Sequence, residues 1–206
     1  MPTAQTPGLR ARQKQARREL IAAAAREVFI ARGFANATLE HIASKAGVSA
    51  PTVVNYFGSK QQILLALLSE PDQQAVRDFR QRLADYRDPV EALCDLEQSM
   101  TAYQLSALPA SLWRELAPYL FTGELAEIFQ PWNAAVVEAA KALLTHFQNL
   151  GLIAKGAQVE VAATVFNQYA NLAFIRLATE AAPDRAAHAA HMRAVFELLC
   201  RGLIAP

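Results

Sequence analysis

The sequence lacks most of the features that mark secreted and membrane proteins. It has two cysteines, Cys94 and Cys200, and their spacing matches neither a disulfide framework nor a zinc site. No stretch approaches the roughly 18 consecutive apolar residues of a membrane span, and the polar, basic residues 1–18 are unlike a signal peptide. We therefore expect a cytoplasmic protein that makes no membrane contact.

Catalytic and cofactor-binding motifs are also missing. The sequence contains no glycine-rich phosphate loop, no serine-centred elbow and no zinc-protease motif. Acidic residues cluster at Glu124, Glu127 and Glu138, without a companion base or nucleophile. His188 and His191 lie three residues apart, but no cysteine or acid completes a metal site at an obvious spacing. We expect no metal, no cofactor and no enzymatic activity.

Glycine and β-branched residues are scarce as well. Eight residues are glycine, whereas 53% of the chain is apolar, with alanine and leucine dominating that share. Alanine and leucine are among the strongest helix formers, and so much apolar surface argues against disorder. The composition therefore predicts an all-α globular protein.

Charge is distributed unevenly along the chain. The first 60 residues carry nine basic and three acidic residues, a net charge of +6. The remaining residues carry 11 basic and 16 acidic residues, a net charge of −5. A basic N-terminal part on an acidic body favours contact between the N-terminal part and a polyanion.

The first third of the chain contains closely spaced helix signals. Thr38, Ser49 and Ser59 stand at N-cap positions, and Gln62 completes a capping box with Ser59. Gly33 supplies a left-handed helix stop. After a flexible basic arm, the expected helices cover residues 13–32, 39–46, 50–57 and 61–68.

Longer helices are expected in the rest of the chain. Pro71 ends the fourth helix, and Pro131 kinks or divides a later one. These later helices are expected over residues 72–87, 89–105, 109–121, 124–150, 157–181 and 184–203.

The short helices have the spacing of a helix-turn-helix. Ala43 allows two crossing helices to approach, Gly47 can adopt the positive φ of the turn, and Val53 is a compact buried contact. Ile42, Val48 and Phe57 complete a small core. We therefore divide the chain into an arm (1–12), a helix-turn-helix domain (13–68) and a second helical domain (69–206).

In this segment the sequence resembles the TetR family of bacterial transcriptional repressors. The resemblance covers roughly residues 13–68, and its main positions are Gly33-Phe34, 37–43, 46–49, Thr52, Tyr56-Phe57, Ser59-Lys60 and 63–65. It implies a DNA-binding N-terminal domain and a C-terminal domain for effector binding and dimerisation.

The second helix of such a motif enters the major groove of double-stranded DNA. The resemblance implies phosphate contacts at Thr38 and Lys60, next to helix N-termini that offer free amides. We expect Ser49 mainly to cap its helix and, as a lesser role, to contact phosphate. The resemblance also places DNA contacts at Ala50, Pro51, Thr52, Val54, Asn55 and Tyr56.

Three positions depart from the family pattern. Val54 replaces a common aromatic residue and cannot donate a hydrogen bond to phosphate. Asn55 can pair bidentately with adenine, whereas Ala50, like Pro51, offers only apolar contact. Base reading therefore depends on Asn55, on the basic arm and on DNA shape.

The last two long helices are apolar on two faces. In residues 157–181, one face carries Val161, Val165 and Leu172, and another carries Phe166 and Phe174. A helix of this kind needs cover on both sides, so we expect these helices to form a homodimer that binds a palindromic operator.

Aromatic residues concentrate between residues 103 and 174, interleaved with polar side chains. An apolar cavity with a few polar groups suits a small-molecule effector, here a largely apolar one. Its expected lining residues are Trp113, Phe121, Phe129, Trp132, Asn167 and Asn171.

An alternative remains open at this point. The C-terminal domain could dock a protein partner through its aromatic residues, with the DNA-binding domain unchanged. Release from DNA by a small molecule favours the sensor, whereas co-purification of a partner favours docking.

Overall fold

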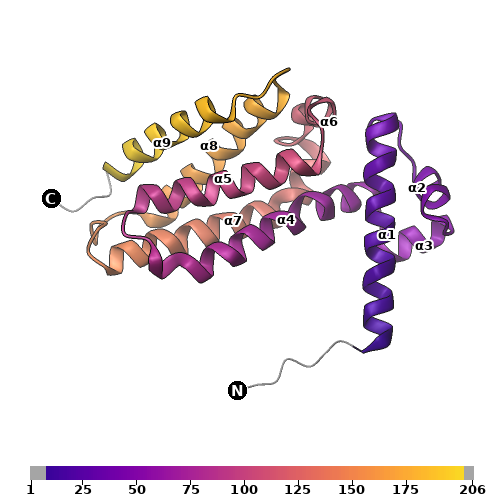
Figure 1. Cartoon of the computed structure of the whole chain (residues 1–206), viewed down its shortest axis with the longest axis horizontal. Coiled ribbons are helices and arrows are strands. Elements are labelled where there is room, and N and C mark those ends of the chain that lie inside the picture. The colour runs from indigo at the N-terminus through magenta and orange to yellow at the C-terminus, as the bar shows by residue number, and fades with distance from the viewer. Residues whose placement is uncertain (1–7, 202–206) are drawn as a thin grey trace. The chain divides into compact units, whose positions relative to one another are not determined.

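The computed structural model describes residues 8–201, without the side chains of residues 70–72, 74 and 75. Regular structure within this part of the chain is helical throughout, which confirms the predicted all-α fold (Figure 1). The internal contacts separate two units, Met1–Leu67 and Leu68–Pro206. Every helix among the described residues is too short or too polar to cross a membrane.

The first unit contains α1 (Leu9–Arg32), α2 (Leu39–Ala46), α3 (Ala50–Phe57) and the beginning of α4 (Lys60–Arg82). The helix α2 packs against both α1 and α3. Apolar residues at helical spacing form the small core, with Ile21, Ala25, Phe29, Ile42, Val53, Ile63 and Leu64 fully buried. The core therefore holds α2 and α3 against the long helix α1.

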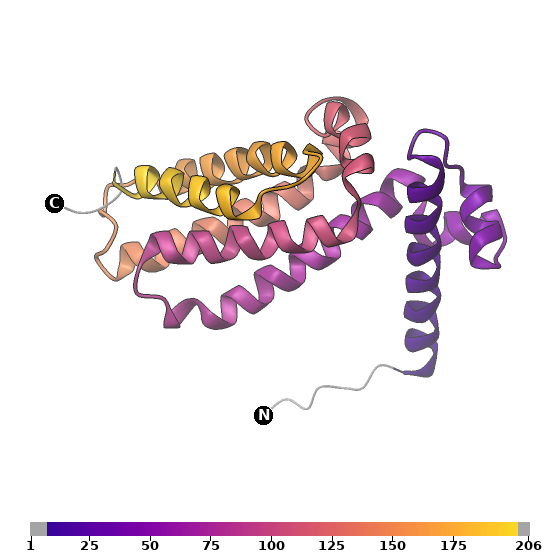
Figure 2. The ribbon, with the colours of Figure 1, turned by 45° about the horizontal axis from the view of Figure 1, so that its top comes forward.

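The second unit contains the rest of α4 and a series of helices down to the C-terminus. These are η1 (Leu83–Asp85), α5 (Pro89–Ala107), α6 (Ala110–Leu116), η2 (Ala117–Tyr119), α7 (Gly123–Asn149), α8 (Val159–Thr179) and α9 (Arg185–Arg201). Figure 2 shows α5, α7, α8 and α9 running side by side, with the short α6 at one end. Their shared core includes Phe79, Leu93, Leu143, Phe147, Phe166 and Phe196.

The predicted helix end near Pro71 is wrong. The chain remains helical from Lys60 to Arg82, so the two expected helices, 61–68 and 72–87, are one. A proline removes one backbone donor and costs about 3 kcal/mol inside a helix. Buried side chains on both sides of the proline, Leu68 and Phe79, offset that cost.

Proline has different effects at two other positions. The helix expected over 109–121 ends at Leu116, and Ala117–Tyr119 form the 3-10 helix η2, which contains Pro118. Proline has no backbone N–H with which to extend the α-helical hydrogen bonds. Pro131, in contrast, does not divide α7.

The N-terminal boundary also differs from the prediction. Residues 9–12 form the first turn of α1, where the sequence predicts a flexible arm, and residues 1–7 lie outside the described part. Gly33 ends α1 with φ 77° and ψ 160°, so the expected positive φ is present, but the left-handed helical conformation is not.

Candidate functional site

The turn between α2 and α3 has the geometry that the sequence predicts. The Thr38 hydroxyl accepts a hydrogen bond from the His41 backbone N–H at 3.2 Å, and the Ser49 hydroxyl accepts one from Thr52 at 3.3 Å. Gly47 lies between the helices in the left-handed conformation, with φ 65° and ψ 33°. Each short helix is therefore capped at its start, and the glycine allows the sharp turn.

The helix α3, which we call the recognition helix, presents a distinct outer face. Pro51, Val54 and Asn55 are exposed there, and Ala50, Thr52 and Tyr56 are partly exposed. Val53 and Phe57 point into the core of the unit. The residues predicted to contact DNA thus share the solvent-facing side of α3, while the remaining two anchor the helix.

Basic residues of α1 lie beside this recognition helix. Arg10, Lys14 and Arg17 line one surface groove together with Thr52 and Tyr56 of α3. All three cations are exposed, and they recur on one face at intervals of three or four residues. Arg10, which the sequence predicts in a flexible arm, therefore lies on α1 with Lys14 and Arg17 and next to α3.

Arg18 has a different role from its basic neighbours. Its guanidinium donates a hydrogen bond to the Tyr56 carbonyl oxygen at 3.2 Å, and its central carbon lies 4.2 Å from the centre of the Phe57 ring. Both partners belong to the last turn of α3. A cation at a helix C-terminus and over an aromatic face stabilises that end, so Arg18 fixes the recognition helix against α1.

Lys60 is engaged within the first unit. Its ammonium donates hydrogen bonds to the carbonyl oxygens of Phe34, Ala35 and Ala37 at 2.8, 3.0 and 3.0 Å. The same nitrogen lies 4.8 Å from the centre of the Phe34 ring. An ammonium has three protons, so these bonds use all of them. Lys60 thus fixes the loop before Thr38, and its expected phosphate contact stays a prediction.

The variant Lys60→Met tests this role, because it keeps an apolar stem of similar length and removes all three donors. We expect a loss of about 1–3 kcal/mol in unfolding free energy, the usual effect of leaving such acceptors without a charged donor. Lys45→Met is the matched control, since Lys45 pairs with the exposed Glu27 and its loss should cost less than about 1 kcal/mol. Urea unfolding followed by far-ultraviolet circular dichroism measures both. Equal stability of Lys60→Met and the native chain would contradict the assignment.

A negative charge already occupies the start of α2. Hydrogen bonds from its own backbone N–H and from the Thr38 hydroxyl hold the pKa of the Glu40 carboxyl below its usual range. A DNA phosphate at Thr38 would lie near this carboxylate. Helix capping is therefore the observed role of Thr38, and its phosphate contact stays a prediction.

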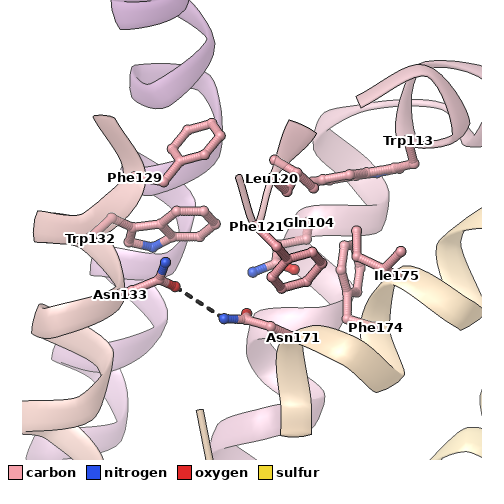
Figure 3. A pocket seen from close by; sticks show the side chains of 10 residues that line it. All are labelled: Gln104, Trp113, Leu120, Phe121, Phe129, Trp132, Asn133, Asn171, Phe174 and Ile175. Carbon is pink, nitrogen blue, oxygen red and sulfur yellow. Dashed lines mark hydrogen bonds between the residues drawn. The ribbon is translucent and has the colours of Figure 1, made fainter. Parts of the chain in front are cut away.

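The second unit contains a small cavity between α5, α6, α7 and α8 (Figure 3). Its volume is about 40 Å³, and the residues that line it are Gln104, Trp113, Leu120, Phe121, Phe129, Trp132, Asn133, Asn171, Phe174 and Ile175. The Trp113 ring meets Phe174 edge-on at 4.8 Å, and the Asn171 side chain donates a hydrogen bond to Asn133 at 3.0 Å. The cavity is thus aromatic, with an amide pair on one side.

Five of the six predicted effector residues line this cavity: Trp113, Phe121, Phe129, Trp132 and Asn171. Asn167 is buried but lies outside the lining. Gln104 and Asn133 were not predicted, although Gln104 could have been suspected as a polar residue on the apolar face of α5. Asn133, half-buried beside Trp132, carries no such signal in the sequence.

The two-faced pattern of α8 separates into a buried and an exposed side. Phe166 and Phe174 lie in the core, whereas Val161, Val165 and Leu172 are exposed. On α9, Leu198 is the most exposed large apolar side chain that the structure describes, at 72%. Apolar side chains on neighbouring helices thus face solvent within the single chain.

The two histidines of α9 do not converge on a shared site. His188 lies 2.8 Å from Glu97 of α5, and His191 lies 2.6 Å from the Tyr169 hydroxyl of α8. Among the described residues, no three histidine, cysteine or acidic side chains gather as a metal site would require.

Both cysteines are buried in the core of the second unit, and burial raises the pKa of Cys94 and raises that of Cys200 to about 12. Because the thiolate is the reactive form, we expect neither cysteine to react with a disulfide reagent at pH 8 in the folded protein. Both should react within minutes in urea. Titration with an aromatic disulfide reagent measures this, and rapid labelling without denaturant would contradict the prediction.

These features define a helical protein with a helix-turn-helix unit and a separate helical unit that contains an aromatic cavity. Residues 21–67 match the family model described as "Bacterial regulatory proteins, tetR family". The transcriptional activator FasR of Mycolicibacterium smegmatis is 36% identical over 97 residues, which cover 43% of this chain and 44% of FasR. The uncharacterized regulator TtgW of Pseudomonas putida is 36% identical over 101 residues, which cover 48% of this chain and 75% of TtgW. The chain spans less than half of the length of FasR.

Solved structures of other proteins are similar to this chain over nearly its whole length. The FadR repressor of Thermus thermophilus, solved with lauroyl-CoA, is 25% identical with a TM-score of 0.71, covering 92% of this chain and 96% of FadR. A TetR-family regulator of Syntrophomonas wolfei has a TM-score of 0.77 at 17% identity, and the match covers 94% of this chain and 99% of that regulator. The chain belongs to the TetR family of transcriptional regulators.

Proposed function

We propose that the protein is a homodimeric repressor that binds a palindromic operator and is released by a small, largely apolar effector. The observation that carries the DNA-binding part is the exposed face of α3 beside the basic face of α1. Transcription can be regulated in either direction, since the relative FasR is named an activator. Repression is the direction we propose.

In this proposal the exposed residues of α3 read the bases. Asn55 supplies the bidentate pair with adenine, and Pro51 and Val54 contact thymine methyl groups. Ala50, Thr52 and Tyr56 lie at the edge of the same face, and Ser49 precedes it. Arg10, Lys14 and Arg17 add charge along the phosphate backbone, which supplies affinity without sequence preference.

The effector part of the proposal rests on the aromatic cavity. A volume of about 40 Å³ holds about three water molecules, so an effector must enlarge the cavity as it binds. Such a movement is what a sensor requires, because a ligand acts only through states that bind it differently. A second structural neighbour, FadR of Bacillus subtilis, was solved in complex with stearoyl-CoA, which supports ligand binding by this fold.

Compound screening on the operator complex tests the effector proposal. Both tryptophans of the chain, Trp113 and Trp132, line the cavity, so their fluorescence reports its occupation. An effector should change this fluorescence and lower operator affinity about 100-fold, a coupling of about 2.7 kcal/mol. A ligand that fills the cavity and leaves operator affinity unchanged contradicts release by an effector.

A protein-docking role is the second candidate, because Tyr119 and Phe121 are 58% and 54% exposed beside the cavity. Exposed neighbouring aromatic residues are typical of protein interfaces. Co-purification of one partner, lost in a Tyr119→Ser/Phe121→Ser variant and combined with insensitivity to all compounds, would favour docking. Retention of the partner by that variant would contradict it.

A further inference from the structure

The buried side of α5 carries a polar stripe that extends beyond the aromatic cavity. Glu97, Thr101 and Gln104 lie four and three residues apart, which places them on one helix face, and all three are buried. Together with Asn171 and Phe174 of α8, they line a second, smaller cavity. It shares Gln104, Asn171 and Phe174 with the aromatic cavity, so the two adjoin.

Glu97 is satisfied at one oxygen and not at the other. Its Oε1 accepts a hydrogen bond from the Thr101 hydroxyl at 2.7 Å and lies 2.8 Å from His188 Nε2. Its Oε2 is fully buried and has no hydrogen-bond partner within the described part of the chain. Buried polar atoms are nearly always paired, and an unpaired carboxylate oxygen is among the most costly exceptions. This oxygen therefore lacks a donor among the described residues, and Glu97 lines the smaller cavity, where a bound molecule can supply one.

The surroundings of Glu97 favour a cationic donor. Among the described residues that line the two cavities, Glu97 is the only ionisable side chain. The remaining lining is apolar, aromatic or neutral, with Trp113 and Phe174 in edge-to-face contact. Aromatic faces attract cations, and a single carboxylate in a largely apolar site discriminates between ligands by their charge.

We propose that Glu97 is the recognition group for an effector with a cationic amine or amidine at one end and an apolar body. The inference rests on the proposed function, since it names the chemical class of that effector. The cationic end binds Glu97 Oε2, and the apolar body extends between Trp113, Phe129 and Trp132. His188 and Thr101 hold the other oxygen and so orient the carboxylate. Because His188 belongs to α9, the site is connected to that helix.

Three compounds that differ only in one end group test the proposal: 4-phenylbutylamine, 4-phenylbutanol and 4-phenylbutanoate. Their binding to the full-length protein is measured by tryptophan fluorescence and by calorimetry. We expect the amine to bind at least 10-fold more tightly than the alcohol, and the carboxylate to bind most weakly. The variant Glu97→Gln should reduce the preference for amine over alcohol to less than about threefold while it keeps its affinity for the alcohol. Glu127→Gln, which changes an exposed glutamate of α7, is the matched control and should keep the full preference.

The outcomes separate the inference from the proposed function. If the native chain binds the amine and the alcohol equally, or binds the carboxylate more tightly than either, the proposed role of Glu97 is wrong. In both cases the proposal of an apolar effector stays in place. Failure of all three to bind at millimolar concentration overturns the inference and counts against an apolar effector site as well. The comparison of amine, alcohol and carboxylate binding by the native chain tests the role of Glu97 even when Glu97→Gln does not fold, because it needs no variant.

Discussion

Replacing Leu198 by aspartate is expected to break the proposed dimer into monomers and to abolish tight operator binding. Leu198 and the α8 residues Val161, Val165 and Leu172 are exposed in the single chain and face solvent on neighbouring helices. In a two-fold dimer the substitution occurs twice, and each copy loses about 2 kcal/mol of leucine burial and gains the cost of a buried charge. The dimer dissociation constant should therefore rise at least about 1,000-fold.

Sedimentation equilibrium measures the dimer, and fluorescence anisotropy with operator DNA measures the consequence. A monomer reaches one half-site, so operator affinity should fall by about 100-fold or more at the same protein concentration. Leu152→Asp is the matched control, because Leu152 is an exposed leucine outside α8 and α9. A Leu198→Asp protein that sediments as a dimer would show that α9 is not part of the interface.

Replacing Asn55 by alanine is expected to remove the sequence preference at one or two positions of each half-site while leaving the fold intact. Asn55 is exposed on α3, and neither of its neighbours on that face, Pro51 and Val54, can donate or accept a side-chain hydrogen bond. One bidentate contact to a base is worth about 1–3 kcal/mol, so two half-sites together should lose about 100-fold in operator affinity. Binding to unrelated DNA should stay within about twofold, because the phosphate contacts remain.

Competition between operator and unrelated DNA at fixed salt measures this ratio. Asn36→Ala is the matched control, since Asn36 is an exposed asparagine in the loop between α1 and α2 and donates a hydrogen bond to the Arg32 carbonyl oxygen. An equal loss on both DNA types would place Asn55 at the backbone and contradict its role in base reading.

The helix-turn-helix could be predicted in detail because its determinants are local. The caps at Thr38 and Ser49, the turn at Gly47 and the buried Val53 all lie within 16 residues, and each acts through its nearest neighbours in sequence. Local signals of this kind need no knowledge of the rest of the fold.

Roles that depend on distant contacts could not be predicted in the same way. Lys60 bonds to carbonyls 23 to 26 residues away, and Arg18 bonds to one 38 residues away. The sequence shows basic side chains at these positions, but its spacing does not show which of them turn inward and bond to backbone carbonyls. Glu97 is the strongest case, since its partner His188 is 91 residues distant and only packing of α5 against α9 brings them together.

The prolines show why the helix boundaries were predicted less well. Pro71 and Pro131 lie inside helices, whereas α6 ends ahead of Pro118. The local cost of proline is similar at each position. What differs is the apolar surface that a continuous helix buries on both sides, and this depends on tertiary packing.

Selection from a pool of random double-stranded DNA tests the central claim most directly. The full-length protein should enrich an inverted repeat whose half-site centres lie about 10 base pairs apart, or a multiple of that, as two recognition helices on one dimer require. The Asn55→Ala protein, selected in parallel, should lose the preference at one or two positions in each half-site and retain its affinity for the pool. Enrichment of no sequence by the native chain, or of the same sequence by both proteins, would contradict a dimeric regulator that reads DNA through α3.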